Sequence, residues 1–135
     1  MDISIDTSEV TMNIENLAEN ILPSKIQEAL DKACLIVEND AKARCPSGTG
    51  QLRASIKHRV IGNEGEVGTN VVYAPYVEFG TGIYAEAGNG RQTPWKYQDR
   101  NGNWHTTRGM TPRPYLRPAL DENRAQIIQC FEDLL

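Results

Sequence analysis

The chain has 135 residues, a length that fits one domain with a modest hydrophobic core. Hydrophobic residues make up 39% of it, and no apolar run reaches the roughly 18 residues of a membrane span. The first ten residues are acidic and lack an apolar stretch, so we expect no secretion signal. Three irregularly spaced cysteines, Cys34, Cys45 and Cys130, argue against a disulfide framework and predict a reducing compartment.

The formal net charge is −4, but it is unevenly distributed. Residues 1–40 hold nine acidic residues against Lys25 and Lys32, a net −7. Residues 41–114 hold ten basic against five acidic residues, a net +5, and residues 115–135 hold two against four, a net −2. The simpler interpretation is two differently solvated faces. The sharper one is a self-complementary pattern that orients neighbouring subunits.

The N-terminal part combines a short strand with helices. Ile3 and Ile5 alternate with polar residues and predict the strand. A helical pattern begins near Ile14, and Pro23 interrupts it as the first-turn residue of a new helix. From there apolar residues recur every three or four positions, which predicts an amphipathic helix over residues 23–43.

A strict period of two follows, which predicts a half-buried strand over residues 51–60. One face of that strand would carry Leu52, Ala54, Ile56, His58 and Val60, and the other Gln51, Arg53, Ser55, Lys57 and Arg59. The turn signal at residues 62–65 leads to a return strand with Val67, Thr69 and Val71, and so to an antiparallel hairpin.

The next segment predicts a helical turn and then an arm. Pro75 begins the turn, in which Tyr76 and Phe79 share a face that we expect to be buried. Residues 83–112 form a long loop, and an Asn-Gly pair at residues 101–102 predicts a β-hairpin within it. Its aromatic residues are Trp95, Tyr97 and Trp104.

A final helix is predicted from Tyr115 to Leu134, with Pro118 tolerated because it falls in the first turn. We therefore predict an α+β fold in a single domain over residues 1–135. A small, mainly antiparallel sheet packs against the long N-terminal helix and the C-terminal helix, and an extended β-hairpin arm projects from residues 83–112.

The sequence offers little for catalysis or metal binding. The cysteines, His58 and His105 lack the CxxC or HxxxH spacing of metal ligands, so we interpret His58 as a hydrogen-bonded histidine. The glycines at residues 48–50 lack the lysine of a phosphate loop. Glu78 and Glu86 could do acid–base work, but a salt bridge for Glu78 is favoured. We expect no enzyme, no cofactor and no metal.

Basic and aromatic residues suggest binding to another macromolecule. The candidate interface residues are Arg53, Lys57, Arg59, Glu78, Trp95, Tyr97, Trp104 and Arg113. Arginine with aromatic residues is the usual composition of a protein–protein hot spot. The alternative is a nucleic-acid-binding module acting on DNA, in which the aromatic rings stack on bases.

Three strings occur in order: CPSGTGQLRASI at Cys45–Ile56, YAPYVEFGTG at Tyr73–Gly82 and RPYLRPAL at Arg113–Leu120. Together they resemble the tail-completion, or neck, family of long-tailed bacteriophages and prophages, over residues 14–135. The resemblance implies a structural virion protein in head–tail joining, assembled as a ring around the DNA channel. It implies contacts with itself, head-connector and tail-terminator or tail-tube proteins, with DNA passing through the lumen without sequence-specific binding.

The resemblance also implies no catalytic residue, no cofactor and no membrane. It places the protein in the virion neck or tail, and in the host bacterial cytoplasm during assembly. Because the insert at residues 83–112 varies most within the family, its partner has to be found from this chain's own residues.

Overall fold

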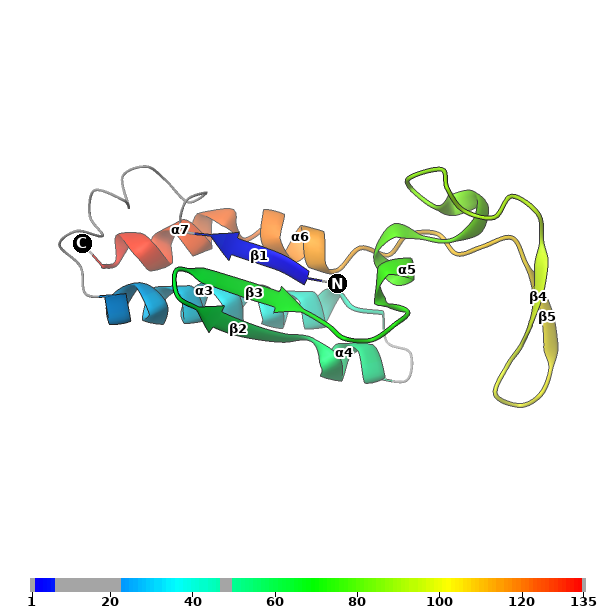
Figure 1. The fold of residues 1–135 in the computed structure, drawn as a ribbon, viewed down its shortest axis with the longest axis horizontal. Coiled ribbons are helices and arrows are strands. Elements are labelled where there is room, and N and C mark those ends of the chain that lie inside the picture. The colour runs from blue at the N-terminus through cyan, green and yellow to red at the C-terminus, as the bar shows by residue number, and fades with distance from the viewer. Residues whose placement is uncertain (1, 7–22, 47–49, 135) are drawn as a thin grey trace. The chain divides into compact units, whose positions relative to one another are not determined.

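A computed structural model describes residues 2–6, 23–46 and 50–134 (Figure 1). The chain divides into two compact units, Met1–Asn70 with Tyr115–Leu135, here the core unit, and Val71–Pro114, here the arm unit. That the two units act as one domain stays a prediction. The helical start predicted near Ile14 lies outside the described residues.

The core unit is organised around helix α3, Pro23–Arg44, which confirms the predicted amphipathic helix. Its buried residues recur at the spacing of one helical face: Ile26, Ala29, Leu30, Ala33, Cys34, Val37 and Ala41. Charged residues on other faces pair along the helix, as Arg44 does with Asp40 at 3.0 Å. Pro23 is its first residue, where a missing backbone N–H removes no helical hydrogen bond.

The core unit also contains a three-stranded antiparallel sheet in the order β1-β3-β2. The strands are β1 (Asp2–Asp6), β2 (Lys57–Ile61) and β3 (Glu64–Gly68). The turn between β2 and β3 consists of Gly62 and Asn63, and Gly62 has a φ of 59°, which favours glycine. The predicted N-terminal strand and the predicted hairpin are thus both confirmed, but β3 begins at Glu64 and ends at Gly68, so Thr69 and Val71 of the predicted return strand lie outside it.

The strand predicted over residues 51–60 is wrong in its first half. Residues Gln51–Ser55 form a short helix, α4, and β2 begins only at Lys57. Leu52 and Ile56 are buried while Ala54 is exposed, which is the spacing of a helical turn. The Ala54 backbone N–H donates to the Gly50 carbonyl at 3.0 Å, a helical hydrogen bond.

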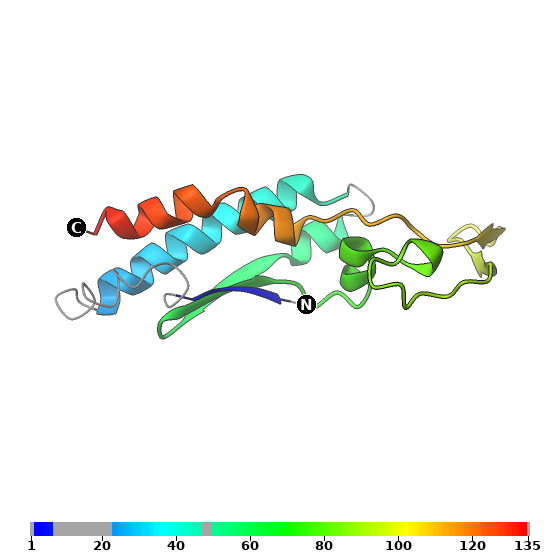
Figure 2. The same ribbon diagram turned by 90° about the horizontal axis from the view of Figure 1, so that it is seen from above.

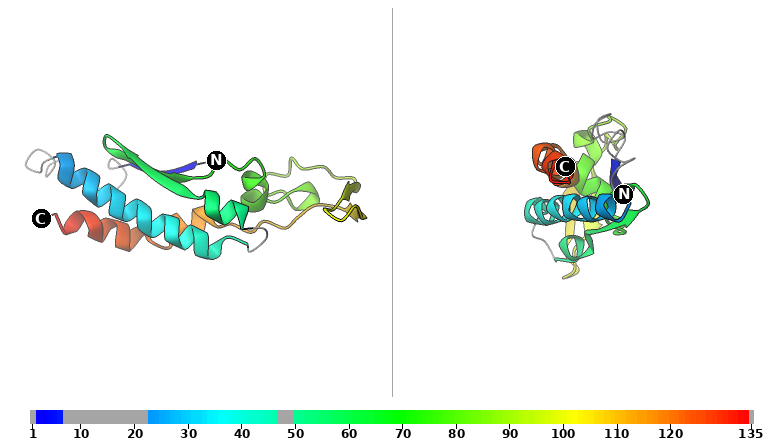
Figure 3. Two further views of the ribbon diagram at one scale, coloured as in Figure 1. Left: turned by 90° about the horizontal axis from the view of Figure 1, so that it is seen from below. Right: turned by 90° about the vertical axis from the view of Figure 1, so that its left-hand side faces the viewer.

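Helix α3 lies between the sheet and the C-terminal helices, as Figures 2 and 3 show from three sides. It contacts β2 and β3 with one side and α6 (Leu116–Asp121) and α7 (Arg124–Glu132) with the other. The fully buried side chains of this unit come from all three layers, and include Leu30, Val37, Ile56, Val67 and Leu116. The predicted packing of a sheet and a C-terminal helix on the N-terminal helix is confirmed.

The predicted single C-terminal helix is instead two helices, because the chain turns at Glu122 and Asn123. Asn123 is largely buried, and its side-chain N–H groups donate to the Ala119 carbonyl and to Asp40, both at 2.7 Å. An asparagine that bonds locally to the backbone competes with continuous helix. The break therefore lies at Asn123, a buried polar residue between the buried apolar residues Ala119 and Ile127.

The arm unit contains helix α5 (Ala74–Phe79), the 3-10 turn η1 (Gly82–Tyr84) and the hairpin strands β4 (Trp95–Gln98) and β5 (Trp104–Thr107). The predicted hairpin is confirmed. Its base is held by backbone hydrogen bonds, from Thr81 N–H to the Met110 carbonyl at 2.9 Å and from Ile83 N–H to the Arg108 carbonyl at 3.0 Å.

Glycine is required where residues 81–83 and residues 108–110 of the arm unit come together. A Cβ on Gly82 would lie 1.9 Å from the Arg108 carbonyl oxygen, and one on Gly109 would lie 2.1 Å from the Thr81 oxygen. Both residues also have positive φ angles, 61° and 131°. Within the described ranges, no helix has the length and apolarity to cross a membrane.

Candidate functional site

The arm unit contains an open, mostly apolar groove of about 930 Å³. Its walls come from α5, from the η1 region and from the residues that lead into β4. They include Pro75, Tyr76, Phe79, Thr81, Ala85, Glu86, Ala87, Asn89, Arg91 and Trp95. A volume of this size falls in the range of protein binding sites. The groove therefore combines apolar surface with one carboxylate and one guanidinium group.

Arg91 and Trp95 both line the groove and contact each other. The Cζ atom of Arg91 lies 5.7 Å from the centroid of the Trp95 ring, within the distance of a cation–π contact. The Arg91 Nε–H donates to the Thr93 hydroxyl at 3.1 Å, which orients the guanidinium. Arg91 is exposed, and a guanidinium plane has two faces on which aromatic rings can stack.

The hairpin has two distinct faces. Tyr97 pairs with His105 and Trp95 with Thr107, so these four share one face, and the Tyr97 and His105 rings stack with centroids 5.2 Å apart. The other face is formed by the alternating residues Lys96, Gln98, Trp104 and Thr106. Trp104 therefore lies on the face opposite Trp95, and it is 67% exposed.

The turn of the hairpin, residues 99–103, is organised by Asp99. One carboxylate oxygen accepts from the backbone N–H groups of Asn101 and Asn103, each at 2.9 Å, and the other pairs with His105 Nε2 at 2.7 Å. The His105 hydrogen bond, and then the backbone N–H groups, lower the pKa of Asp99. Gly102 has a φ of 84°, as the predicted Asn-Gly turn requires.

Exposed apolar side chains concentrate in the arm unit. Of the twelve large exposed hydrophobic residues in the described chain, nine lie between residues 71 and 114. These are Val72, Tyr73, Tyr76, Phe79, Ile83, Tyr84, Tyr97, Trp104 and Met110. A concentration of exposed large apolar side chains in one unit is typical of interaction surfaces on soluble proteins.

The predicted burial of Tyr76 and Phe79 is wrong, because they are 55% and 39% exposed. In α5 the buried positions are instead Ala74 and Glu78, which are spaced four residues apart and share a helical face. Glu78 is fully buried and is engaged in an interaction. A buried carboxylate needs a partner within the fold, and the predicted role of Glu78 at an interface stays a prediction.

The other candidate interface residues fall into two groups. In the core unit, Lys57 and Arg59 are exposed on β2, whereas Arg53 lies on α4 and its guanidinium donates to the Cys45 carbonyl at 3.1 Å. Arg59 pairs with Glu66 at 2.6 Å. The predicted single row of three basic residues is therefore wrong, since Arg53 is on a helix.

In the arm unit, Tyr97, Trp104 and Arg113 are exposed and Trp95 is half-buried. The role of all these residues at an interface stays a prediction. The groove was not predicted from the sequence. The features that could have indicated it are Arg91 four residues before Trp95 and the two aromatic residues of α5, Tyr76 and Phe79.

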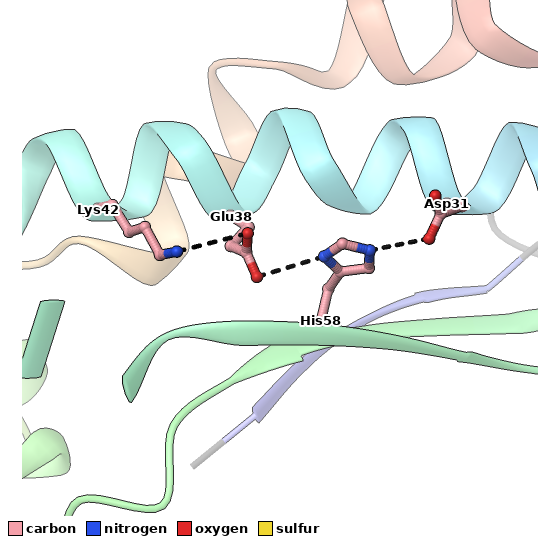
Figure 4. Close-up of polar contacts among 4 residues, drawn as sticks. All are labelled: Asp31, Glu38, Lys42 and His58. Carbon is pink, nitrogen blue, oxygen red and sulfur yellow. Dashed lines mark hydrogen bonds and ion pairs between the residues drawn. The ribbon is translucent and has the colours of Figure 1, made fainter. Parts of the chain in front are cut away.

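His58 connects β2 to α3, as Figure 4 shows. Its Nε2 lies 2.9 Å from an Asp31 oxygen and its Nδ1 lies 3.3 Å from a Glu38 oxygen, and Lys42 pairs with Glu38 at 3.6 Å. Carboxylates only accept hydrogen bonds, so a ring with both protons satisfies both contacts. The interpretation of His58 as a hydrogen-bonded histidine is confirmed.

The cysteines are free, and burial together with the nearby Asp31 and Glu38 charges raises the pKa of Cys34 to about 12. A thiol with so high a pKa is a poor nucleophile and metal ligand at neutral pH. Among the described residues, no group of three or more His, Cys, Asp or Glu side chains is arranged to hold a metal ion.

The comparison with protein families places part of the chain in a known family. The family described as "Bacteriophage HK97-gp10, putative tail-component" matches residues 8–80, more than half of the chain. No curated protein and no solved structure matches the chain. The matched region includes α3, the β2–β3 hairpin and α5, and ends before the groove-lining residues 81–95 and the hairpin arm. On this evidence the chain belongs to the HK97-gp10 family of bacteriophage tail components.

Proposed function

We propose that this protein is a structural component of the head–tail joint, which completes the tail by assembling as a ring around the DNA channel. The family match supports a role in the tail. The proposal of a ring is carried by one observation, the concentration of exposed aromatic and aliphatic side chains in the arm unit. A protein that leaves this much apolar surface uncovered is expected to bury it against neighbours.

The charges of the two units favour a contact between unlike surfaces. The arm unit holds five basic and three acidic residues, a net +2, and the rest of the chain holds nine basic and fifteen acidic residues, a net −6. When one surface of a subunit meets a different surface of its neighbour, the contacts close into a ring if the rotation permits. We expect such contacts to weaken with salt.

Contact with the DNA in the channel is a second candidate, because Lys57 and Arg59 are exposed side by side on β2. Arg59 is paired with Glu66, which leaves little net charge at this position. We therefore expect at most weak, sequence-independent binding. A duplex-binding constant that falls steeply with salt would favour this candidate over a purely structural role.

The proposed function can be tested on virions and on the purified chain. Antibodies against the chain should label virions at the head–tail joint, and electron microscopy of the concentrated protein should give closed rings that open as salt is raised. Antibody labelling elsewhere on the particle would contradict the proposed position at the head–tail joint. A two-fold dimer as the sole assembled form would contradict the ring.

A further inference from the structure

We propose that Trp104 of one copy of the chain docks into the arm-unit groove of a second copy, where its indole stacks on Arg91. The proposal rests on the proposed ring, because it supplies the contact by which neighbouring subunits join. Each chain carries both halves of this contact, a groove and an anchor.

The geometry of the hairpin prevents a chain from filling its own groove in this way. Trp95 lines the groove, and by the strand register Trp104 lies on the opposite face of the same hairpin. An anchor that faces away from its own groove can serve only the groove of another molecule. The contact is therefore head-to-tail, and repeating it produces a ring or an open chain of subunits.

The groove offers matched chemistry to this anchor. One side of the Arg91 guanidinium lies over Trp95, and a second indole on its other side would form a Trp95–Arg91–Trp104 stack. Tyr76 and Phe79 provide apolar walls, exposed by 55% and 39%. Tryptophan and arginine are the side chains most enriched at the centres of interfaces.

Charge also favours a second copy as the occupant. Lys96 shares the hairpin face of Trp104 and is exposed, and the groove carries Glu86 on its wall. A carboxylate accepts several hydrogen bonds, so Glu86 can receive an ammonium group in addition to its existing interaction. The incoming Lys96 can thus pair with Glu86, while Arg91, the other charged residue of the groove wall, stacks on the incoming indole.

A single indole is too small to hold two free subunits together strongly. A tryptophan side chain buries about 150–250 Å², whereas stable interfaces bury about 1,200–2,000 Å² in total. We therefore expect a weak contact between free chains that strengthens when the ring brings many subunits together. Such a contact is measurable at protein concentrations up to about 1 mM.

The first test reads the environment of Trp104 directly. The chain has two tryptophans, so Trp95→Phe leaves Trp104 as the single indole and keeps an aromatic ring under Arg91. As the purified full chain is concentrated to about 1 mM, acrylamide quenching should fall and the emission maximum should move to shorter wavelength. Quenching that does not change with concentration would overturn the proposal, as would a change produced solely by added single-stranded oligonucleotide.

The second test separates the two halves of the contact. Trp104→Ala removes the anchor, and Ala87→Phe fills the groove from an exposed position on its wall. Each variant alone should associate about 30-fold more weakly or worse, the loss typical of a hot-spot residue. An equimolar mixture should regain one contact and sediment as a heterodimer. A mixture that stays monomeric would overturn the head-to-tail contact.

Tyr84→Ala is the matched control, since Tyr84 is an exposed aromatic of the same unit that is not among the groove-lining residues. It should associate like the original chain. Closed rings formed by Trp104→Ala would reject this contact and leave the proposed ring intact. Burial of Trp104 in an open pair without rings would support the contact and reject the ring, so the two proposals fail separately.

Discussion

The core unit and the arm unit use apolar residues in opposite ways. Of the 17 buried hydrophobic residues in the described chain, 16 belong to the core unit and one, Ala74, to the arm unit. Most of the exposed large hydrophobic residues belong to the arm unit. The core unit is thus stabilised by burial within the chain. In the arm unit, backbone hydrogen bonds between residues 81–83 and 108–110 hold the base of the hairpin. Under the proposed function, the core unit carries the stability of the chain and the arm unit carries the recognition of neighbours.

The largest effect that would break this comparison is expected at Leu30, which is fully buried on α3. Leu30→Ala should lower the free energy of unfolding by about 2–5 kcal/mol, as for other buried leucines. Trp104→Ala, at an exposed position, should change it by no more than about 0.5 kcal/mol. Urea denaturation of both variants checks the contrast, and a similar loss in the two would mean that the arm also carries stability.

The next effect concerns two neighbouring residues of α5. Glu78→Ala should destabilise the protein by about 1–3 kcal/mol or more, because each polar group left unpaired in a buried site carries that cost. Phe79→Ala should lose well under the about 3–5 kcal/mol of a fully buried phenylalanine, since Phe79 is 39% exposed.

Thermal and urea denaturation would rank these two variants, with Glu78→Gln as the control that keeps the shape of the side chain. This order reverses the one that the sequence favours, in which Phe79 is buried and structural and Glu78 acts at an interface. If Phe79→Ala lowered the free energy of unfolding more than Glu78→Ala, the sequence-based prediction of a structural Phe79 would be correct.

A smaller effect is expected at the break between α6 and α7. Asn123→Ala removes the hydrogen bonds to Ala119 and Asp40, and should lower the free energy of unfolding by about 1 kcal/mol. Asp40 keeps its pair with Arg44, so its carboxylate is still satisfied. Arg124→Ala, which removes an exposed pair with Asp121, serves as the control and should have almost no effect. If both variants lowered the free energy of unfolding equally, the hydrogen bonds of Asn123 would not stabilise the break between α6 and α7.

Sequence patterns predicted the elements whose periodicity extends over many residues or whose turn chemistry is explicit. Helix α3 has seven buried positions in register, and the two hairpins are marked by Gly62-Asn63 and Asn101-Gly102. The family was also predicted correctly from short strings, although the matched region covers residues 8–80 and omits the third string at Arg113–Leu120.

The errors have a common physical cause. Over five residues, a period of two and a helical turn both place Leu52 and Ile56 on one side, so the pattern predicts a strand where the chain forms α4. In α5 the expectation that the aromatic residues are buried is wrong, because Tyr76 and Phe79 line the open groove while Ala74 and Glu78 take the buried face. The groove could not be predicted, since it depends on how α5 and residues 81–95 fold together.

The smallest effect is expected at the tip of the arm, where it can be read as a change in pKa. The His105 hydrogen bond is the main cause of the lowered pKa of Asp99, followed by the backbone N–H groups of the turn. Because the pKa is lower in the folded hairpin, the Asp99 carboxylate stabilises the turn at pH values above its unfolded pKa. That contribution is lost as pH falls through the folded pKa.

We therefore expect the hairpin to open under acidic conditions while the core unit stays folded, as followed by the NMR signals of Tyr97 and Trp104. His105→Ala should raise the Asp99 pKa toward its ordinary value and shift this opening to higher pH. Thr106→Ala, on the other hairpin face, is the control and should leave the Asp99 titration in place. If the Asp99 carboxyl titrated at the same pH in His105→Ala and in the original chain, the backbone of the turn alone would order the arm tip. The conformation of the arm tip would then not depend on the hairpin face that carries Tyr97 and His105.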